Sequence, residues 1–70
     1  MLKIPVSSSV VASVGYDADR KVLEIKLLSG KVYRYHRVSR DVFEEFCAAA
    51  SKGAYLNAHI KDAYLWEQVK

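Results

Sequence analysis

Apolar and polar residues alternate along the first half of the chain, which is the pattern of half-buried β-strands. Residues 23–27 alternate three aliphatic side chains with a glutamate and a lysine, and a further strand-like segment follows from Tyr33. Residues 17–21 and a serine-glycine pair separate the segments and suit tight connections. The first segment, residues 10–16, places these side chains on one side: Val10, Ala12, Val14 and Tyr16. The pattern predicts a three-stranded antiparallel β-meander.

The connection before the third strand decides which way its tyrosines face. A two-residue loop at Ser29-Gly30 would place Tyr33 opposite Lys26 and leave the tyrosines on the polar face. A three-residue loop, with Gly30 in a left-handed bulge conformation, moves the register by one residue. We expect this second register because it makes one face apolar and the other charged. It pairs Tyr33 with Ile25, Arg34 with Glu24, and Tyr35 with Leu23.

A helix is predicted after the third strand. Ser39 suits its N-cap, and Gly53 suits its C-terminal stop. Residues at helical spacing between them form an apolar stripe: Val42, Phe43, Phe46, Cys47 and Ala50. Packed on the apolar face of the sheet, this stripe would give a two-layer α+β fold.

The two ends of the chain carry weaker patterns. Residues 1–9, with Pro5 and a run of serines, are expected to form an N-terminal arm to a single domain at residues 10–70. Residues 64–69 alternate in part, so a terminal strand and a docked extended segment are both open. Before them, a short second helix would carry these apolar residues: Tyr55, Leu56 and Ile60.

Composition limits the classes of protein that fit. Seventy residues make one domain, and an apolar content of 51% excludes a disordered chain. Cys47 is the single cysteine, which fits a reducing compartment, and the apolar runs are too short to span a bilayer. His36 and His59 match no metal-ligand spacing, and no nucleophile–base pair is readable. We therefore expect a soluble cytoplasmic protein that is not an enzyme, has no cofactor or metal, and does not bind membranes.

Charge adds a candidate chemistry. The net charge is +3, and the segment from Lys31 to Arg40 contains four basic residues, two tyrosines and no acid. Aromatic faces stack on bases and arginines hold phosphates, so this composition is typical of nucleic-acid-binding segments. The alternative is a half-buried strand with tyrosines inward and a solvated charged face, which small domains need for solubility.

Two motifs are specific in combination: the Tyr-x-Tyr of Tyr33 and Tyr35, and the Ser-Lys-Gly-x-Tyr-x-Asn run from Ser51 to Asn57. Their order resembles the KTSC domain, which is named for its occurrence at the C-terminus of some lysyl-tRNA synthetases and also occurs as a small bacterial or phage protein. The resemblance covers about residues 6–69. It implies no established activity, and its synthetase context suggests RNA binding. Ser39 stands where the family often has proline, and either residue can open a helix.

The leading hypothesis is therefore an RNA-binding accessory module, with tRNA as the RNA. Its phosphate contacts would come from residues on and around the open sheet face: Lys26, Arg34, His36, Arg37, Arg40, Lys52 and Lys61. Residues of the family motifs are expected to be structural: Tyr33, Tyr35, Ser51, Gly53, Tyr55 and Asn57. The alternative is a protein-interaction adaptor or homo-oligomerising module that binds no nucleic acid. Trp66 becomes a stacking or partner-binding candidate if it is exposed.

Overall fold

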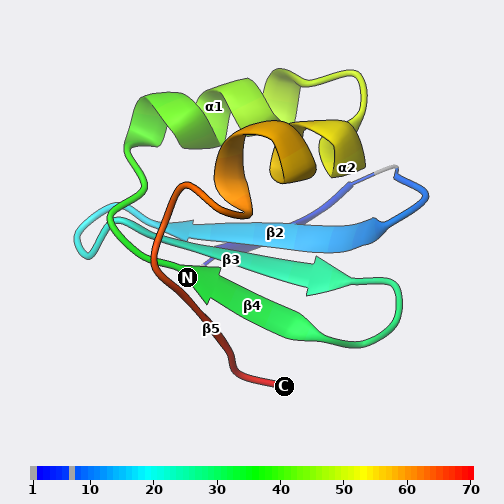
Figure 1. The fold of residues 1–70 in the computed structure, drawn as a ribbon, viewed down its shortest axis with the longest axis horizontal. Coiled ribbons are helices and arrows are strands. Elements are labelled where there is room, and N and C mark those ends of the chain that lie inside the picture. Colours follow the sequence, from blue (N-terminus) through cyan, green and yellow to red (C-terminus); the bar gives the residue numbers. More distant parts are fainter. Residues whose placement is uncertain (1, 7) are drawn as a thin grey trace.

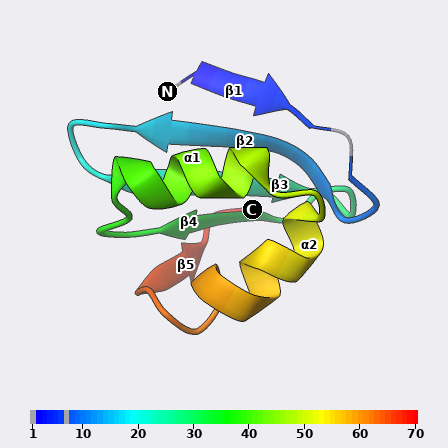
Figure 2. The same cartoon turned by 90° about the horizontal axis from the view of Figure 1, so that it is seen from above.

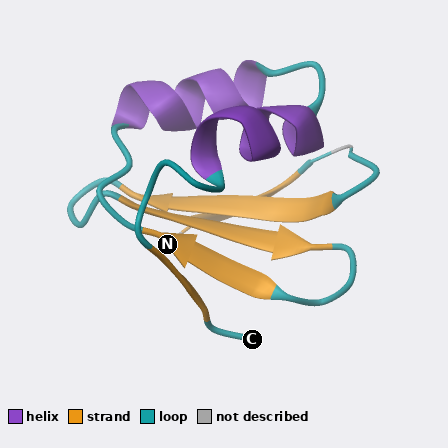
Figure 3. Ribbon diagram, in the orientation of Figure 1, coloured by secondary structure: helices purple, strands orange, loops and turns teal. Residues whose placement is uncertain are grey.

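The computed structural model describes residues 2–6 and 8–70, with residues 2 and 3 described by their backbone alone. Within these residues, strands form one antiparallel sheet in the order β1-β2-β3-β4-β5. The strands are β1 (Leu2–Pro5), β2 (Val11–Asp17), β3 (Val22–Leu27), β4 (Val32–Tyr35) and β5 (Trp66–Gln68). The helical segments are α1 (Arg40–Ala48), α2 (Lys52–Tyr55) and the π-helical η1 (Leu56–Ile60), which continues α2. All three lie on one face of the sheet (Figures 1 and 3), so the expected two-layer α+β class is confirmed.

The predicted register between β3 and β4 is confirmed. Tyr33 pairs with Ile25, and Tyr35 pairs with Leu23. Gly30 has a φ of 96°, and its N–H donates to the Leu27 carbonyl oxygen at 3.0 Å. A left-handed residue at the end of a three-residue loop is the bulge that this register requires. Both tyrosines therefore face the helical layer.

The alternation expected for the first strand is wrong at its start. Val11 is fully buried, and Val10 is exposed, although Val10 was expected on the side of Val14 and Tyr16. The pairing of β2 with β3 shifts between Val11 and Ser13, where one strand has an extra residue. This bulge reverses the faces of the residues that precede it, which simple alternation cannot reveal.

The N-terminal segment, expected to be an arm, contains the edge strand β1. Leu2 pairs with Tyr16, and Pro5 pairs with Ser13. Proline is tolerated in an edge strand, so Pro5 does not prevent β1 from pairing with β2. Ser8 lies in the loop after β1, where its Oγ accepts a hydrogen bond from the Val11 N–H at 3.2 Å. The Ser7 part of the expected serine loop lies outside the described residues.

The predicted helix is present but ends earlier than expected. Ser39 is its N-cap, and the Ser39 Oγ accepts a hydrogen bond from the Val42 N–H at 3.4 Å. Gly53 does not stop this helix, because α1 ends at Ala48 and Gly53 lies inside α2. Ser51 caps the second helix through a 3.2 Å bond from the Ala54 N–H, so the chain restarts a helix where a stop was expected. Ala50, expected on the apolar stripe, is exposed between the two helices.

The C-terminal segment forms both a helix and a strand. In the α2–η1 segment, Leu56 and Ile60 are buried, as expected for a short second helix. Strand β5 then pairs with β4, with Trp66 opposite Tyr35 and Gln68 opposite Tyr33. Of the two conformations left open for residues 64–69, the terminal strand is therefore the observed one.

The core lies between the sheet and the helices. Seen from above, α1 lies over β2 and β3, and the α2–η1 segment lies toward β4 and β5 (Figure 2). The opposite face of the sheet has no helix of the described residues on it (Figure 1). The largest fully buried side chains fill the space between the two layers: Val11, Val14, Leu23, Ile25, Val38, Phe46 and Ile60. On this second face, Lys26 and Arg34 are exposed, whereas Glu24 is buried.

Candidate nucleic-acid interface

The open face of the sheet carries acids beside its predicted cations. Arg34 lies between Glu24 on β3 and Glu67 on β5 in directly paired positions. The Arg34 Nε donates to the Glu24 Oε2 at 3.1 Å, and the His36 Nε2 lies 3.4 Å from the Glu67 Oε1. Lys26 is exposed on the same face. Because acids face both Arg34 and His36, the described side chains of this face have little excess positive charge to offer to phosphates.

Two other predicted cations lie on the helical layer, where Arg40 is exposed and Lys52 is half-buried. The Arg40 Nε lies 3.3 Å from the Glu44 Oε1, one helical turn further along α1. The Lys52 Nζ donates to the Ala49 carbonyl oxygen at 2.6 Å, which satisfies a backbone group beyond the C-terminus of α1. The structure therefore does not bring the predicted cations together on one surface.

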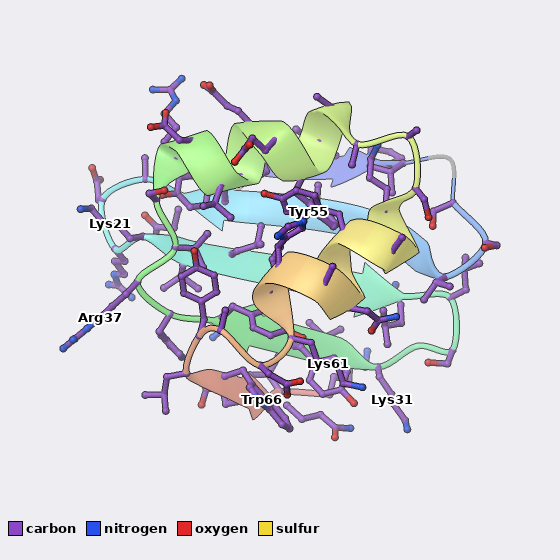
Figure 4. The ribbon with its side chains drawn as sticks, turned by 45° about the horizontal axis from the view of Figure 1, so that its top comes forward. Lys21, Lys31, Arg37, Tyr55, Lys61 and Trp66 are labelled. Atoms are coloured by element: carbon purple, nitrogen blue, oxygen red, sulfur yellow. The ribbon has the colours of Figure 1, made fainter. Side chains whose placement is uncertain are left out.

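Two cations do gather at one end of the sheet. Lys21 in the β2–β3 turn and Arg37 after β4 both have left-handed backbone, with φ of 56° and 59°. The two turns are joined by a 2.9 Å hydrogen bond from the Val38 N–H to the Lys21 carbonyl oxygen. Figure 4 shows both side chains extending from this end, away from Lys31. Within the described residues neither side chain has an ion-pair partner.

His36 joins Arg37 at this end. Both line an open hollow of about 490 Å³, together with Ala63, Tyr64 and Leu65 from the segment before β5. We name Lys21 and Arg37 the basic end. Sequence reasoning found His36 and Arg37 but missed Lys21, because its proximity to Arg37 depends on the packing of two turns that are distant in the chain.

The aromatic motif residues line a separate cavity of about 210 Å³, which we name the aromatic pocket. Its walls come from β3, β4, β5, η1 and the residues that precede β2 and follow η1: Val10, Leu27, Tyr33, Tyr35, Leu56, Asn57, Lys61 and Trp66. Tyr33 and Trp66 meet edge to face, with ring centroids 5.5 Å apart and planes at 72°. Trp66 is 51% exposed, so the condition that would make it a stacking or partner-binding candidate is met.

The remaining motif residues hold helices in place. Gly53 packs so closely that an added Cβ would lie 3.3 Å from the Val10 Cγ2. The Tyr55 ring meets Phe46 edge to face at 5.9 Å, and its hydroxyl donates to the Glu45 Oε2 at 3.3 Å. With the N-cap at Ser51, these contacts give Ser51, Gly53 and Tyr55 structural positions, whereas Tyr33, Tyr35 and Asn57 border a cavity.

The described residues present little that could perform covalent or metal chemistry. They contain no group of three or more histidine, cysteine or acidic side chains placed to hold a metal ion. Burial raises the pKa of the Cys47 thiol above its ordinary value, which keeps the sulfur in its less nucleophilic form. No helix that the structure describes is long and apolar enough to cross a membrane.

Comparison with known proteins agrees with this fold and these motifs. The profile of the KTSC domain family matches residues 7–64. The chain belongs to the KTSC domain family. A crystal structure of a KTSC domain protein from Yersinia pestis superposes with a TM-score of 0.95 and 35% identity, covering 99% of this chain and 97% of that one.

Relatives of this KTSC domain include both small proteins and synthetases. A protein of Tsukamurella paurometabola is 33% identical over 86% of this chain and 90% of its own length. An uncharacterised protein of Stutzerimonas stutzeri is 34% identical over 87% of this chain and 86% of its own length. A lysine–tRNA ligase of Nostoc punctiforme is 36% identical over 87% of this chain, which corresponds to 11% of the ligase. Neither the family description nor the names of the two small relatives states a catalytic activity.

Proposed function

We propose that this KTSC domain is an RNA-binding accessory module that works in the cytoplasm, with tRNA as the first RNA to test. The observation that carries the proposal is the basic end, where Lys21 and Arg37 extend from two turns joined by a backbone hydrogen bond. The occurrence of a similar segment in a lysine–tRNA ligase supports RNA as the anionic partner. The fold supplies a rigid base for these cations, because the sheet fixes both turns.

The basic end would contact the sugar-phosphate backbone. Phosphate contacts position a protein on a nucleic acid and carry no direct sequence information. Two such contacts predict weak binding, with a slope of log affinity against log salt of about −2. Arg34 is not part of this surface, since its guanidinium already binds Glu24. We propose that Lys26, Arg40 and Lys52 contribute long-range attraction and that Lys61 contributes a direct contact.

Fluorescence anisotropy of labelled tRNA at two salt concentrations tests this proposal, with a DNA duplex of matched length beside it. Reversing charge at the basic end, Lys21→Glu with Arg37→Glu, is expected to weaken tRNA binding at least tenfold. The matched control reverses Lys26 and Lys31, both exposed, and changes the net charge by the same amount. If both double variants bind tRNA as tightly as the unmodified protein, the proposal is overturned. If both lose the same amount of affinity for tRNA, binding is non-specific attraction and the basic end is not the binding site.

A protein-interaction module is the second candidate, and one observation favours it. Strand β5 lies at the edge of the sheet, and Leu65 immediately before it is 79% exposed. An apolar side chain beside an uncovered strand edge suits pairing with another chain. Sedimentation equilibrium over a wide concentration range separates the possibilities, since a strict monomer at high concentration would exclude a homodimer formed through this edge.

A further inference from the structure

We infer that the aromatic pocket holds one unpaired RNA base, whose adjoining phosphate contacts Lys61. The inference rests on the proposed function for its choice of RNA as the ligand, and it adds a base-binding site to the phosphate contacts of the basic end. Each feature of the pocket restricts the occupant further: its size, its exposed aromatic ring, and the polar groups of Tyr35, Asn57 and Lys61.

The size of the pocket fits a single ring system. Its volume of about 210 Å³ is below the roughly 300 Å³ at which pockets for drug-sized ligands begin. Aliphatic side chains of Val10, Leu27 and Leu56 form part of the wall. Apolar walls suit the face of a flat base, whereas a base that stays paired in a duplex presents only its edge to the groove. The pocket therefore selects single-stranded segments, loops or chain ends.

Trp66 gives the pocket an exposed stacking surface. Its side chain is 51% exposed even though the ring packs edge to face against Tyr33. Pairing of β5 with β4 places Trp66 directly opposite Tyr35, and the edge-to-face contact with Tyr33 holds the indole on one side. An indole that is held on one side and half exposed loses little freedom when a base stacks on it.

The polar groups of the pocket suit a base with a phosphate beside it. Tyr35 is only 4% exposed, yet its hydroxyl makes no hydrogen bond to another described residue. Among those residues, every fully buried side-chain oxygen or nitrogen has a hydrogen-bond partner. Because the Tyr35 hydroxyl has no such partner, it is accessible to solvent. The Asn57 amide also forms no bond within the described part of the chain, and it offers both a donor and an acceptor to a base edge.

Lys61 supplies the charge that favours a nucleotide over an uncharged aromatic ligand. Its side chain lines the pocket, and Figure 4 shows it projecting on the same side of the molecule as Trp66. It has no ion-pair partner within the residues that the structure describes. An apolar slot with a free ammonium group beside it complements a base whose phosphate is one sugar away.

The position of Trp66 provides a direct test, because it is the single tryptophan of the chain. Its intrinsic fluorescence is measured during titration with adenosine monophosphate, with ribose phosphate, and with an unstructured oligoadenylate. We expect saturable quenching by adenosine monophosphate and by the oligonucleotide, and none by ribose phosphate. Lys61→Gln should weaken both responses at least threefold, while Lys31→Gln, at an exposed lysine that does not line the pocket, should leave them unchanged.

The two proposals fail in different ways. If tRNA binds by anisotropy while neither adenosine monophosphate nor the oligonucleotide quenches Trp66, RNA binding stands and the base pocket is wrong. If adenosine monophosphate quenches Trp66 but tRNA does not bind, the pocket stands and the proposed function is wrong. Quenching by ribose phosphate as strong as that by the nucleotide would also overturn the base site. Tyr33→Leu keeps an apolar wall but removes the ring that packs against Trp66, so it should reduce quenching. Circular dichroism verifies that this variant is folded.

Discussion

Glu24 and Arg34 face each other across strands β3 and β4, with the Arg34 Nε 3.1 Å from the Glu24 Oε2. Glu24 is 6% exposed although it lies on the face opposite the helices. The pair therefore stabilises the sheet where the central strand β3 meets β4, and Arg34 donates to a carboxylate that has little access to water. This relationship gives the Arg34 Nε a structural contact within the sheet.

Replacing Arg34 by alanine is expected to lower the free energy of unfolding by about 1–3 kcal/mol, because a buried carboxylate loses a charged hydrogen-bond donor. Arg34→Lys should recover part of this loss, since an ammonium group keeps the charge but lacks the planar geometry of guanidinium. Urea unfolding followed by circular dichroism measures both. Lys26→Ala, on the same face and exposed, should change stability by less than about 0.5 kcal/mol. Equal effects of Arg34→Ala and Lys26→Ala would contradict this account of the pair.

Much of the central fold can be predicted from local pattern. The charge pair of Glu24 with Arg34 and the apolar alternation of both strands select one register, and Gly30 supplies the turn that this register needs. The edge strands could not be predicted in the same way. Strand β1 contains Pro5, and β5 consists of three exposed residues, so each exists because a neighbouring strand provides its hydrogen-bond partners.

The candidate sites depend on contacts that are distant in the chain. Sequence reasoning grouped Arg34 and His36 with other cations, but Glu67 lies beside both through the pairing of β5 with β4. The basic end arises because the Val38 N–H binds the Lys21 carbonyl oxygen, and no sequence pattern relates these residues. The Tyr-x-Tyr motif pointed to the correct strand, but the aromatic pocket exists only because the C-terminal segment returns beside it.

Stability is expected to fall at alkaline pH because buried tyrosines resist ionisation. Burial raises the pKa of Tyr35 above its ordinary value of about 10, and the nearby Tyr33 and Asp62 raise it further. Burial also raises the pKa of Tyr16, more than Arg40 lowers it. The unfolded chain therefore releases these protons first, so the stabilisation is complete below about pH 10 and is lost as pH rises through the folded-state pKa values.

Urea unfolding at a series of pH values between about 8 and 11 measures this loss. The Tyr35→Phe variant should show a shallower decline, since phenylalanine has no proton to lose. A decline as steep in Tyr35→Phe as in the unmodified protein would assign the alkaline loss to other groups.

Cys47 is expected to react slowly with thiol reagents. The residue lies on the core-facing side of α1, and burial raises its thiol pKa more than Lys52 lowers it, with Glu44 raising it further. Because the thiolate is the reactive form, modification at about pH 8 should be at least several times slower than that of free cysteine. Colorimetric titration with a disulfide reagent measures this rate in the folded protein and in urea. A folded-state rate equal to the rate in urea would show that the core does not protect the sulfur.

Gly30 is expected to be more sensitive to alanine than Gly53. At Gly30 an added Cβ would meet no atom within 4 Å, but the φ of 96° is a conformation that alanine adopts at a cost of roughly 1–2 kcal/mol. At Gly53, inside α2, alanine gains up to about 1 kcal/mol of helix propensity, which is offset by its 3.3 Å approach to the Val10 Cγ2. Gly30→Ala should therefore lower the urea midpoint clearly. Gly30→Asn should lower it less, because asparagine tolerates left-handed backbone. Gly53→Ala should leave the midpoint nearly unchanged. A larger fall in the urea midpoint for Gly53→Ala than for Gly30→Ala would contradict this prediction. It would show that the close packing of α2 on Val10 tolerates alanine less well than the left-handed turn does.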